Sequence, residues 1–384
     1  FFDVLPKSAK KIAVLDRTKE PGSLGEPLYM DIKSMFYNKA DKPLIVGGRY
    51  GLGSKDTTPS QIVAVYNNLS MNEPKDGFTI GIVDDVTYKS LPLESKIESS
   101  QKGTIRCKFW GLGSDGTVGA NKNAIKIIGD KTDLYTQGYF SYDSKKSGGV
   151  TISHLRFGDK PIKSTYLISE ADFISCSQQS YVDKYDLLKG LKKGGTFLLN
   201  TLWNAEELDR YLPGEMKKYI ADNEINFYTI NATEIAEKLG LENRTNMIMQ
   251  SAFFKLADVI SMEDAEKYLK DSIDKEYGKK GQKVLDMNYA AVEKGAGALH
   301  KVEVPTSWAG LEASSVIVRN EDEPDFIKNI LRPVNAQEGD NLPVSAFVGA
   351  ENGMMPHGSA AFEKRGIAVN VPQWVKENCI QCNQ

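Results

Sequence analysis

The chain contains 384 residues, enough for roughly two or three domains and a substantial hydrophobic core. Its 48 Lys and Arg against 51 Asp and Glu give a net charge of −3, which excludes the global positive field typical of nucleic-acid-binding proteins. No apolar run reaches about 18 residues, so the sequence predicts no membrane span, and the short apolar start predicts no signal peptide. We expect a soluble, cytoplasmic protein with no nucleic-acid or membrane partner.

The first 100 residues predict an α/β unit. Short apolar runs at residues 11–16, 43–47 and 78–83 are bounded by turn residues, as is typical of buried parallel strands. Between the last two runs, the sequence Thr58-Pro59-Ser60-Gln61 predicts a helix that begins with a capping box and has proline at its first position.

Residues 103–129 predict a strand, a glycine-rich loop and a helix. Polar and apolar residues alternate from 104 to 109, and Gly111, Gly113 and Gly116 then form the pattern G-x-G-x-x-G. Apolar residues at helical spacing follow, and Gly129 is expected to end the helix. The free N–H groups and the positive end of the helix dipole favour an anion such as pyrophosphate at this loop. Ser114, Asp115 and Thr117 are alternative capping residues for the helix.

The pattern of alternating strands and helices continues to residue 301. Strands are expected at 134–142, 149–157, 172–176, 196–199 and 226–230, and helices at 187–191, 205–211, 232–239, 262–274 and 282–293. This order predicts a multidomain α/β fold with mostly parallel sheets in three αβα layers. Residues 302–370 are broken into short segments by Pro and Gly, which predicts a small α+β linking module.

The residues around the glycine loop leave the identity of its ligand open. A dinucleotide site requires an acidic residue at the end of the second strand, whereas the sequence there is Tyr142-Asp143-Ser144-Lys145-Lys146. The two lysines favour a ligand that carries an additional phosphate, and both NADP and coenzyme A carry a pyrophosphate and a ribose phosphate. A tight turn with solvated lysines and no ligand is the third alternative.

The four cysteines do not form the pattern of a disulfide framework. Cys107 and Cys176 each fall within a predicted strand, and we expect both to be packed thiols. Cys379 and Cys382 form a C-x-x-C motif within six residues of the end of the sequence. This motif is typical of the beginning of a cluster or metal site.

Four stretches of the sequence resemble one known family. They are GRYGLGSKDTTP (48–59), GLGSDGTVGANKNAIKIIG (111–129), FEKRGIAVNVP (362–372) and WVKENCIQCNQ (374–384). Together they closely resemble the pyruvate:ferredoxin oxidoreductases, or pyruvate synthases, of the 2-oxoacid oxidoreductase family. The resemblance covers essentially the whole chain in the family's order, and it implies a central fragment of a longer polypeptide.

The resemblance implies four parts of that polypeptide. Residues 1–100 resemble the family's transketolase C-terminal-like domain, 101–310 its gamma or coenzyme A domain, and 311–370 its linking domain. Residues 371–384 resemble the start of its ferredoxin-type domain, which continues as C-x-x-C-x-x-C-x-x-x-C-P. Cys379 and Cys382 would then be the first two thiolate ligands of a [4Fe–4S] cluster.

The family converts pyruvate to acetyl-coenzyme A on thiamine diphosphate with Mg²⁺, and passes the electrons through iron–sulfur clusters to ferredoxin or flavodoxin. The resemblance implies that the full enzyme is a homodimer. The family's thiamine diphosphate lies between domains that have no counterpart in this chain. We therefore expect the chain to be catalytically silent alone and to contribute no catalytic residue.

The resemblance implies a coenzyme A site in this region. The residues that would line the phosphate or pantetheine portion are Gly113, Ser114, Asp115, Gly116 and Thr117. Lys145 would meet a phosphate, and Asn246 and Asn288 match positions that contact coenzyme A, since an amide both donates and accepts hydrogen bonds. On spacing alone, Asn288 is equally well a helix cap or a surface residue. The rival hypotheses are an NADP-dependent dehydrogenase and a scaffold segment with no ligand site when isolated.

Overall fold

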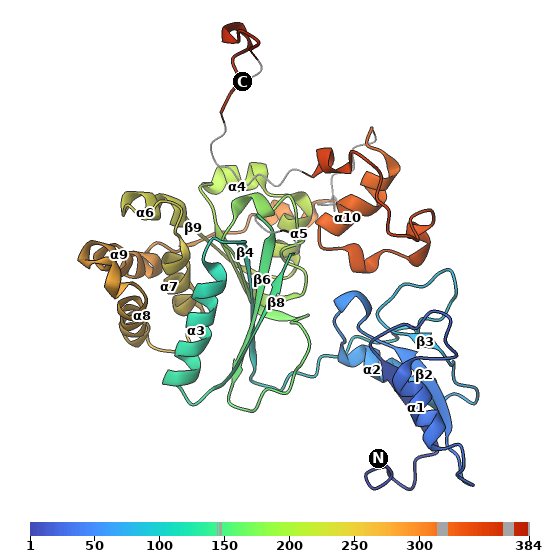
Figure 1. The fold of residues 1–384 in the computed structure, drawn as a ribbon. Coiled ribbons are helices and arrows are strands. Elements are labelled where there is room, and N and C mark those ends of the chain that lie inside the picture. Colours follow the sequence, from blue (N-terminus) through green and yellow to red (C-terminus); the bar gives the residue numbers. More distant parts are fainter. Residues whose placement is uncertain (144, 146–147, 313–321, 364–371, 383–384) are drawn as a thin grey trace.

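The structure is a computed structural model that describes residues 1–143, 145, 148–312, 322–363 and 372–382 (Figure 1). Two β-sheets organise these residues, a small one near the N-terminus and a larger one in the middle of the chain. Within the described residues, none of the helices combines the length and the apolar character needed to cross a bilayer.

The small sheet consists of the parallel strands β1 (Lys11–Asp16), β2 (Leu44–Arg49) and β3 (Phe78–Thr79). Helix α1 (Pro27–Met35) packs against one face, and α2 (Pro59–Ser70) contributes to a separate cluster on the other. The predicted capping box of Thr58 and Gln61 is confirmed at the start of α2. The strand predicted over 78–83 is wrong beyond Thr79, because Gly81 takes a φ of 77° and turns the chain away.

The large sheet has the strand order β10-β9-β8-β7-β4-β6-β5. Its strands are β4 (Ile105–Leu112), β5 (Tyr135–Tyr142), β6 (Val150–Gly158), β7 (Ala171–Cys176), β8 (Leu191–Asn200), β9 (Asn226–Ile230) and β10 (His300–Lys301). The pairs β4–β7, β7–β8 and β8–β9 are parallel. Strand β6 is antiparallel to β4 and β5, and β10 is antiparallel to β9. The prediction of a mostly parallel sheet is confirmed.

Helices cover both faces of the large sheet and give the predicted three layers (Figure 1). One face carries α3 (Thr117–Lys131), α6 (Ala232–Lys238), α7 (Asn246–Ala257), α8 (Met262–Tyr277) and α9 (Gln282–Gly297). The other face carries α4 (Ala205–Tyr211) and α5 (Gly214–Asp222). The neighbours Phe109 and Trp110 on β4 belong to the two opposite clusters, as the alternation of a strand requires.

Two predicted details of the large domain are wrong. Helix α3 continues through Gly129, which lies close against Thr136 of β5, and it ends at Lys131. Residues 187–191 do not form a helix. Gly190 has a φ of 79°, and a Cβ there would lie 2.0 Å from the carbonyl oxygen of Ser169, so the chain turns directly into β8.

The order of strands around the glycine loop departs from a dinucleotide-binding unit. In such a unit, the strand after the helix lies beside the first strand and parallel to it. Here β6 lies between β4 and β5 and is antiparallel to both. The strand, loop and helix predicted from residues 103–129 are confirmed, but the element that faces the loop is the β5–β6 connection.

The C-terminal segment, defined here as residues 322–363, lies against both sheet units. It contains the π-helical turn Ile327–Leu331, α10 (Arg332–Asn335) and several short 3-10 turns. Glu338 pairs with Lys189 of the large unit at 2.8 Å. The backbone N–H of Ser345 donates to Asp85 of the N-terminal unit at 2.9 Å.

The close contact between α7 and α9 generates a stability prediction. A Cβ added at Gly295 of α9 would lie 2.5 Å from the backbone oxygen of Ile248 on α7. We expect Gly295→Ala to lower the free energy of unfolding by about 1–3 kcal/mol, since the helices must separate. The matched control is Gly297→Ala, where no atom lies within 4 Å. Denaturant unfolding checks both variants, and equal effects would contradict the close-packing explanation.

A buried histidine generates a prediction about pH. Burial, and secondarily the charges of Lys108 and Arg156, lower the pKa of His154 to about 3, and its Nδ1 accepts the N–H of Ile168 at 3.2 Å. Below its ordinary pKa of 6.5, only the unfolded chain binds the proton, so stability falls as pH falls. We expect the contribution of this histidine to lower the free energy of unfolding by about 2 kcal/mol when the pH falls from 8 to 5, as measured by denaturant unfolding at each pH.

The matched variant is His154→Asn, which keeps an acceptor for Ile168 but has no titratable group. The difference in unfolding free energy between the two proteins should therefore change by this amount across the pH range. Parallel curves for wild type and variant would contradict the prediction.

Candidate functional site

The loop between β4 and α3 is shaped by close backbone approaches. A Cβ at Gly111 would lie 2.7 Å from the side chain of Thr117, and one at Gly113 would lie 3.1 Å from the oxygen of Gly149. The N–H of Gly113 donates to that same oxygen at 2.8 Å, which ties the loop to the segment before β6. Gly116 is the N-cap of α3 with a φ of 89°. The glycines are therefore needed for the loop's shape.

The carboxylate of Asp115 binds donors of the loop itself. It accepts hydrogen bonds from the N–H of Leu112 at 2.8 Å and from the N–H of Thr117 at 2.7 Å. It also accepts from the hydroxyls of Thr117 at 2.8 Å and of Ser177 at 3.1 Å. Among the three alternative capping residues, Asp115 is thus the one whose carboxylate binds the N–H of the first residue of α3. The carboxylate therefore takes up donors at the N-terminus of the helix and stabilises the conformation of the loop.

A cavity of about 330 Å³ lies at the outer side of the loop. Its lining combines two segments that the sequence analysis singled out, the loop residues Gly113, Ser114, Asp115 and Gly116, and Lys145 from the β5–β6 connection. Leu112 and Val118 also line it on the side of the loop, and Tyr142, Asp143 and residues 149–151 line it on the side of β5 and β6. The arrangement joins backbone amides, the N-terminal end of a 15-residue helix and one lysine around a single space.

Lys145 is held by three acceptors in this structure. Its Nζ lies 3.1 Å from Oε1 of Glu363, 3.2 Å from Oδ1 of Asn335 and 3.5 Å from Oδ2 of Asp143. Its side chain is 21% exposed, and the residue lines the cavity. The adjacent Lys146 lies outside the described residues.

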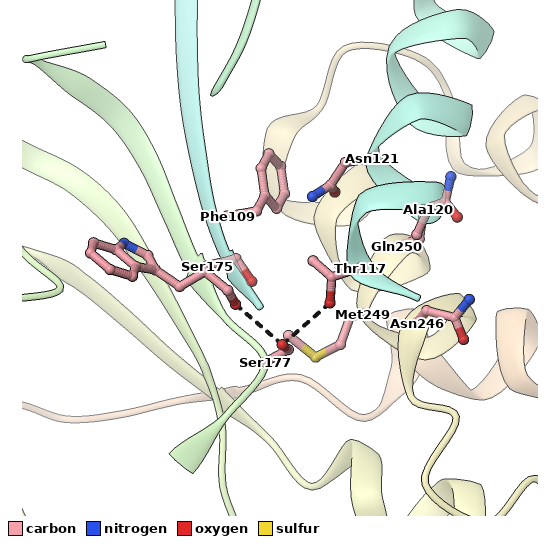
Figure 2. A pocket seen from close by; sticks show the side chains of 10 residues that line it. Phe109, Thr117, Ala120, Asn121, Ser175, Ser177, Asn246, Met249 and Gln250 are labelled. Atoms are coloured by element: carbon pink, nitrogen blue, oxygen red, sulfur yellow. Dashed lines mark hydrogen bonds between the residues drawn. The ribbon is translucent and has the colours of Figure 1, made fainter. Parts of the chain in front are cut away.

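Behind the loop lies a second, much smaller pocket of about 20 Å³ (Figure 2). Asn246 and Gln250, one turn apart on α7, line it together with Thr117 and Ser177. Nδ2 of Asn246 would be 3.2 Å from a Cβ at Gly116, so this asparagine lies directly against the loop. Among the described residues, Gln250 is one of few buried side chains whose polar atoms have no hydrogen-bond partner.

The other predicted site residues lie apart from the cavity. Asn288 is buried in α9, lines neither of these two pockets, and donates to the carbonyl oxygen of Val284 in its own helix at 2.7 Å. Cys379 and Cys382 are exposed free thiols. Within the described residues, no three His, Cys, Asp or Glu side chains gather as a metal site.

The two cysteines of the large sheet are packed thiols, as expected. Cys107 and Cys176 are fully buried. Burial raises the pKa of Cys107 well above its ordinary value and that of Cys176 to about 12. Both sulfurs therefore stay protonated near neutral pH and do not act as nucleophiles.

Sequence reasoning missed two contributors to the site. Ser177 follows β7, which lies beside β4, and its hydroxyl reaches Asp115. The available signal was its position at the carboxyl end of a strand, where parallel sheets gather functional groups. Glu363 approaches Lys145 from the C-terminal segment, and no local pattern in the sequence indicates that contact.

Comparisons with known proteins agree with the resemblance drawn from the four stretches. A family model described as pyruvate ferredoxin/flavodoxin oxidoreductase matches residues 106–298, and a domain of unknown function, EKR, matches residues 313–368. The pyruvate oxidoreductase subunit PORC of Thermotoga maritima, a solved structure, is 18% identical with a TM-score of 0.43, covering 53% of this chain and 100% of that chain.

The chain is 63% identical over 385 residues to the pyruvate-flavodoxin oxidoreductase of Enterobacter agglomerans, and 59% identical over 386 residues to the pyruvate:ferredoxin oxidoreductase of Moorella thermoacetica. Both alignments cover the whole chain, but only 33% and 32% of these relatives, so the chain spans about one third of their length. Because the family model matches half of the chain and includes the whole glycine loop, the chain belongs to the pyruvate ferredoxin/flavodoxin oxidoreductase family.

Proposed function

We propose that the cavity beside the glycine loop binds coenzyme A through its phosphates, and that the chain is the coenzyme A-binding part of a larger pyruvate-oxidising enzyme. The observation that carries the proposal is the convergence of residues 113–116 and Lys145 on one cavity, although they come from separate segments. Membership of an oxidoreductase family named for pyruvate supports it.

The chemistry of the lining suits a polyphosphate ligand. The positive end of the α3 dipole favours an anion, and the Lys145 ammonium adds a positive charge at the same cavity. Asp115 and Thr117 bond to each other, so their role is to hold the loop in shape. When bound, coenzyme A would supply the thiol that accepts an acetyl group.

The rival NADP hypothesis is weakened by the topology. The antiparallel strand β6 replaces the parallel neighbour that a dinucleotide-binding unit places beside its first strand. The scaffold hypothesis predicts no ligand at all. A binding experiment therefore distinguishes the three.

We extend the proposal to the larger enzyme by family membership. Residues 1–100, 101–310, 311–370 and 371–384 would correspond to its transketolase C-terminal-like, coenzyme A, linking and ferredoxin-type parts. Thiamine diphosphate and Mg²⁺ would be bound outside this chain, ferredoxin or flavodoxin would accept the electrons, and the enzyme would be a cytoplasmic homodimer. The relatives' names, which pair pyruvate with ferredoxin or flavodoxin, support the assignment of substrate and acceptor.

The two terminal cysteines fit part of a [4Fe–4S] site. Cys379 and Cys382 have C-x-x-C spacing and are both exposed and free, as thiols that ligate an entering metal must be. Such a cluster takes four thiolates, so these residues would hold it only together with ligands from elsewhere in the enzyme. We propose Cys379 and Cys382 as the first two ligands of this cluster.

We also propose that Asn288 contacts coenzyme A, and that this contact forms only after α9 or the ligand rearranges.

The central test is calorimetric titration of the chain with coenzyme A and with NADP. We expect heat with coenzyme A only, and a loss of affinity of about tenfold or more in Lys145→Gln, since a hydrogen bond from a charged group to phosphate is lost. The control is Lys126→Gln, on an exposed lysine farther along α3, which should bind as wild type does. Heat with NADP alone would support the dehydrogenase, and no heat with either ligand would support the scaffold.

Asp115 gives a second test of the site. If its carboxylate shapes the loop, Asp115→Asn should weaken coenzyme A binding several-fold, because an amide cannot accept all four hydrogen bonds. If the carboxylate merely faced the ligand, removing its negative charge would strengthen the binding of phosphate. Calorimetric titrations of wild type and variant at one salt concentration show whether the affinity for coenzyme A falls or rises.

A further inference from the structure

Lys145 stands at the junction of two cavities. It lines the proposed ligand cavity and also a larger one of about 510 Å³ that is formed with the C-terminal segment. Asn335 and Glu363 of that segment line the larger cavity, and both contact the Lys145 ammonium. Glu363, which is far from Lys145 in the sequence, therefore contacts the same ammonium that we propose to bind a phosphate.

The ammonium of Lys145 already has polar partners in this arrangement, because it donates a hydrogen bond to Asn335 and forms ion pairs with Glu363 and Asp143. An ammonium has three N–H donors, and Asp143, Asn335 and Glu363 place three acceptor oxygens within 3.5 Å of it. A phosphate oxygen that binds the same nitrogen competes with these partners for the ammonium. It would also bring a second negative charge close to a carboxylate, which is unfavourable in a partly buried site.

The three acceptors differ in how easily they can leave. Asp143 belongs to the same β5–β6 connection as Lys145. Its backbone N–H is bonded to Val150, and its carboxylate accepts the N–H of Lys145 at 3.3 Å. Glu363 and Asn335 belong to the C-terminal segment, and Glu363 is the more exposed of the two carboxylates, at 31% against 12%. The group that a phosphate displaces most readily is therefore Glu363.

We propose that Glu363 is an exchangeable counter-ion of the ligand site, which competes with a ligand phosphate for Lys145. Phosphate binding then loosens the C-terminal segment from the large sheet, and docking of the segment lowers the affinity for the ligand by the same factor. The inference rests on the proposed function, because it requires a phosphate-bearing ligand in this cavity. It assigns Glu363 a role in setting affinity and in coupling the site to the neighbouring segment.

The test is calorimetric titration of the 384-residue chain with coenzyme A in wild type, Glu363→Gln, Lys145→Gln and the double variant. We expect Glu363→Gln to bind about three- to fivefold more tightly than wild type, as the removal of one ion pair with a partly exposed lysine allows. In the Lys145→Gln background, the same substitution should have no effect, so the double-mutant cycle shows coupling. Glu224→Gln is the control, since Glu224 pairs with Lys193 at 2.7 Å, lies outside the C-terminal segment and lines neither cavity.

Hydrogen–deuterium exchange provides a second readout that does not depend on affinity. Saturating coenzyme A should speed exchange at residues 327–335 in wild type, and Glu363→Gln should speed it without ligand. Wild-type binding with unchanged or weaker affinity in Glu363→Gln, or slower exchange on ligand binding, overturns the inference and leaves the proposed function standing. Absence of coenzyme A binding in wild type and in Glu363→Gln refutes the proposed function and the inference together.

Discussion

The carboxylate of Asp115 is the interaction on which the site depends. It joins the end of β4, the first residue of α3 and the residue that follows β7, through four hydrogen bonds of 2.7–3.1 Å. A charged acceptor with this many donors holds its neighbours more firmly than a neutral one does. The bonds that this carboxylate accepts from Leu112 and Thr117 fix the shape of the loop beside the cavity.

The acceptors around Lys145 determine how strongly its ammonium can bind an added anion. Two carboxylates and an amide surround it, so the ammonium is already compensated before any ligand arrives. A phosphate gains from this lysine only the difference between its own hydrogen bonds and those that it replaces. The site is consequently suited to reversible exchange of a ligand. Through Asn335 and Glu363, the lysine also contacts a segment that touches both sheet units.

Local patterns predicted most of the fold and only part of the site. The strands, the glycine loop and helices such as α4 and α6 follow from periodicity and capping, which depend on neighbouring residues. The antiparallel insertion of β6 depends on pairing between distant residues, and so does the contact of Asn246 with Gly116. Glu363 meets Lys145 across 218 positions of the chain (363 minus 145), a separation for which one sequence contains no signal. Residues 187–191 were predicted as helix from their pattern of apolar residues, but Leu187 and Leu188 are buried in a turn and Leu191 begins β8.

The antiparallel pair β5–β6 has an evolutionary consequence. Lys145 and Gly149 lie on the connection between β5 and β6, near the edge of the sheet, whereas the glycine loop follows β4, which lies between β7 and β6. That connection takes no part in the pairings of β4 with β7, β7 with β8 or β8 with β9, so changes in its length and charge are compatible with their register. Selection can thus alter the number and position of positive charges facing a ligand without disturbing the core. Ligand preference and fold stability are separately adjustable in this architecture.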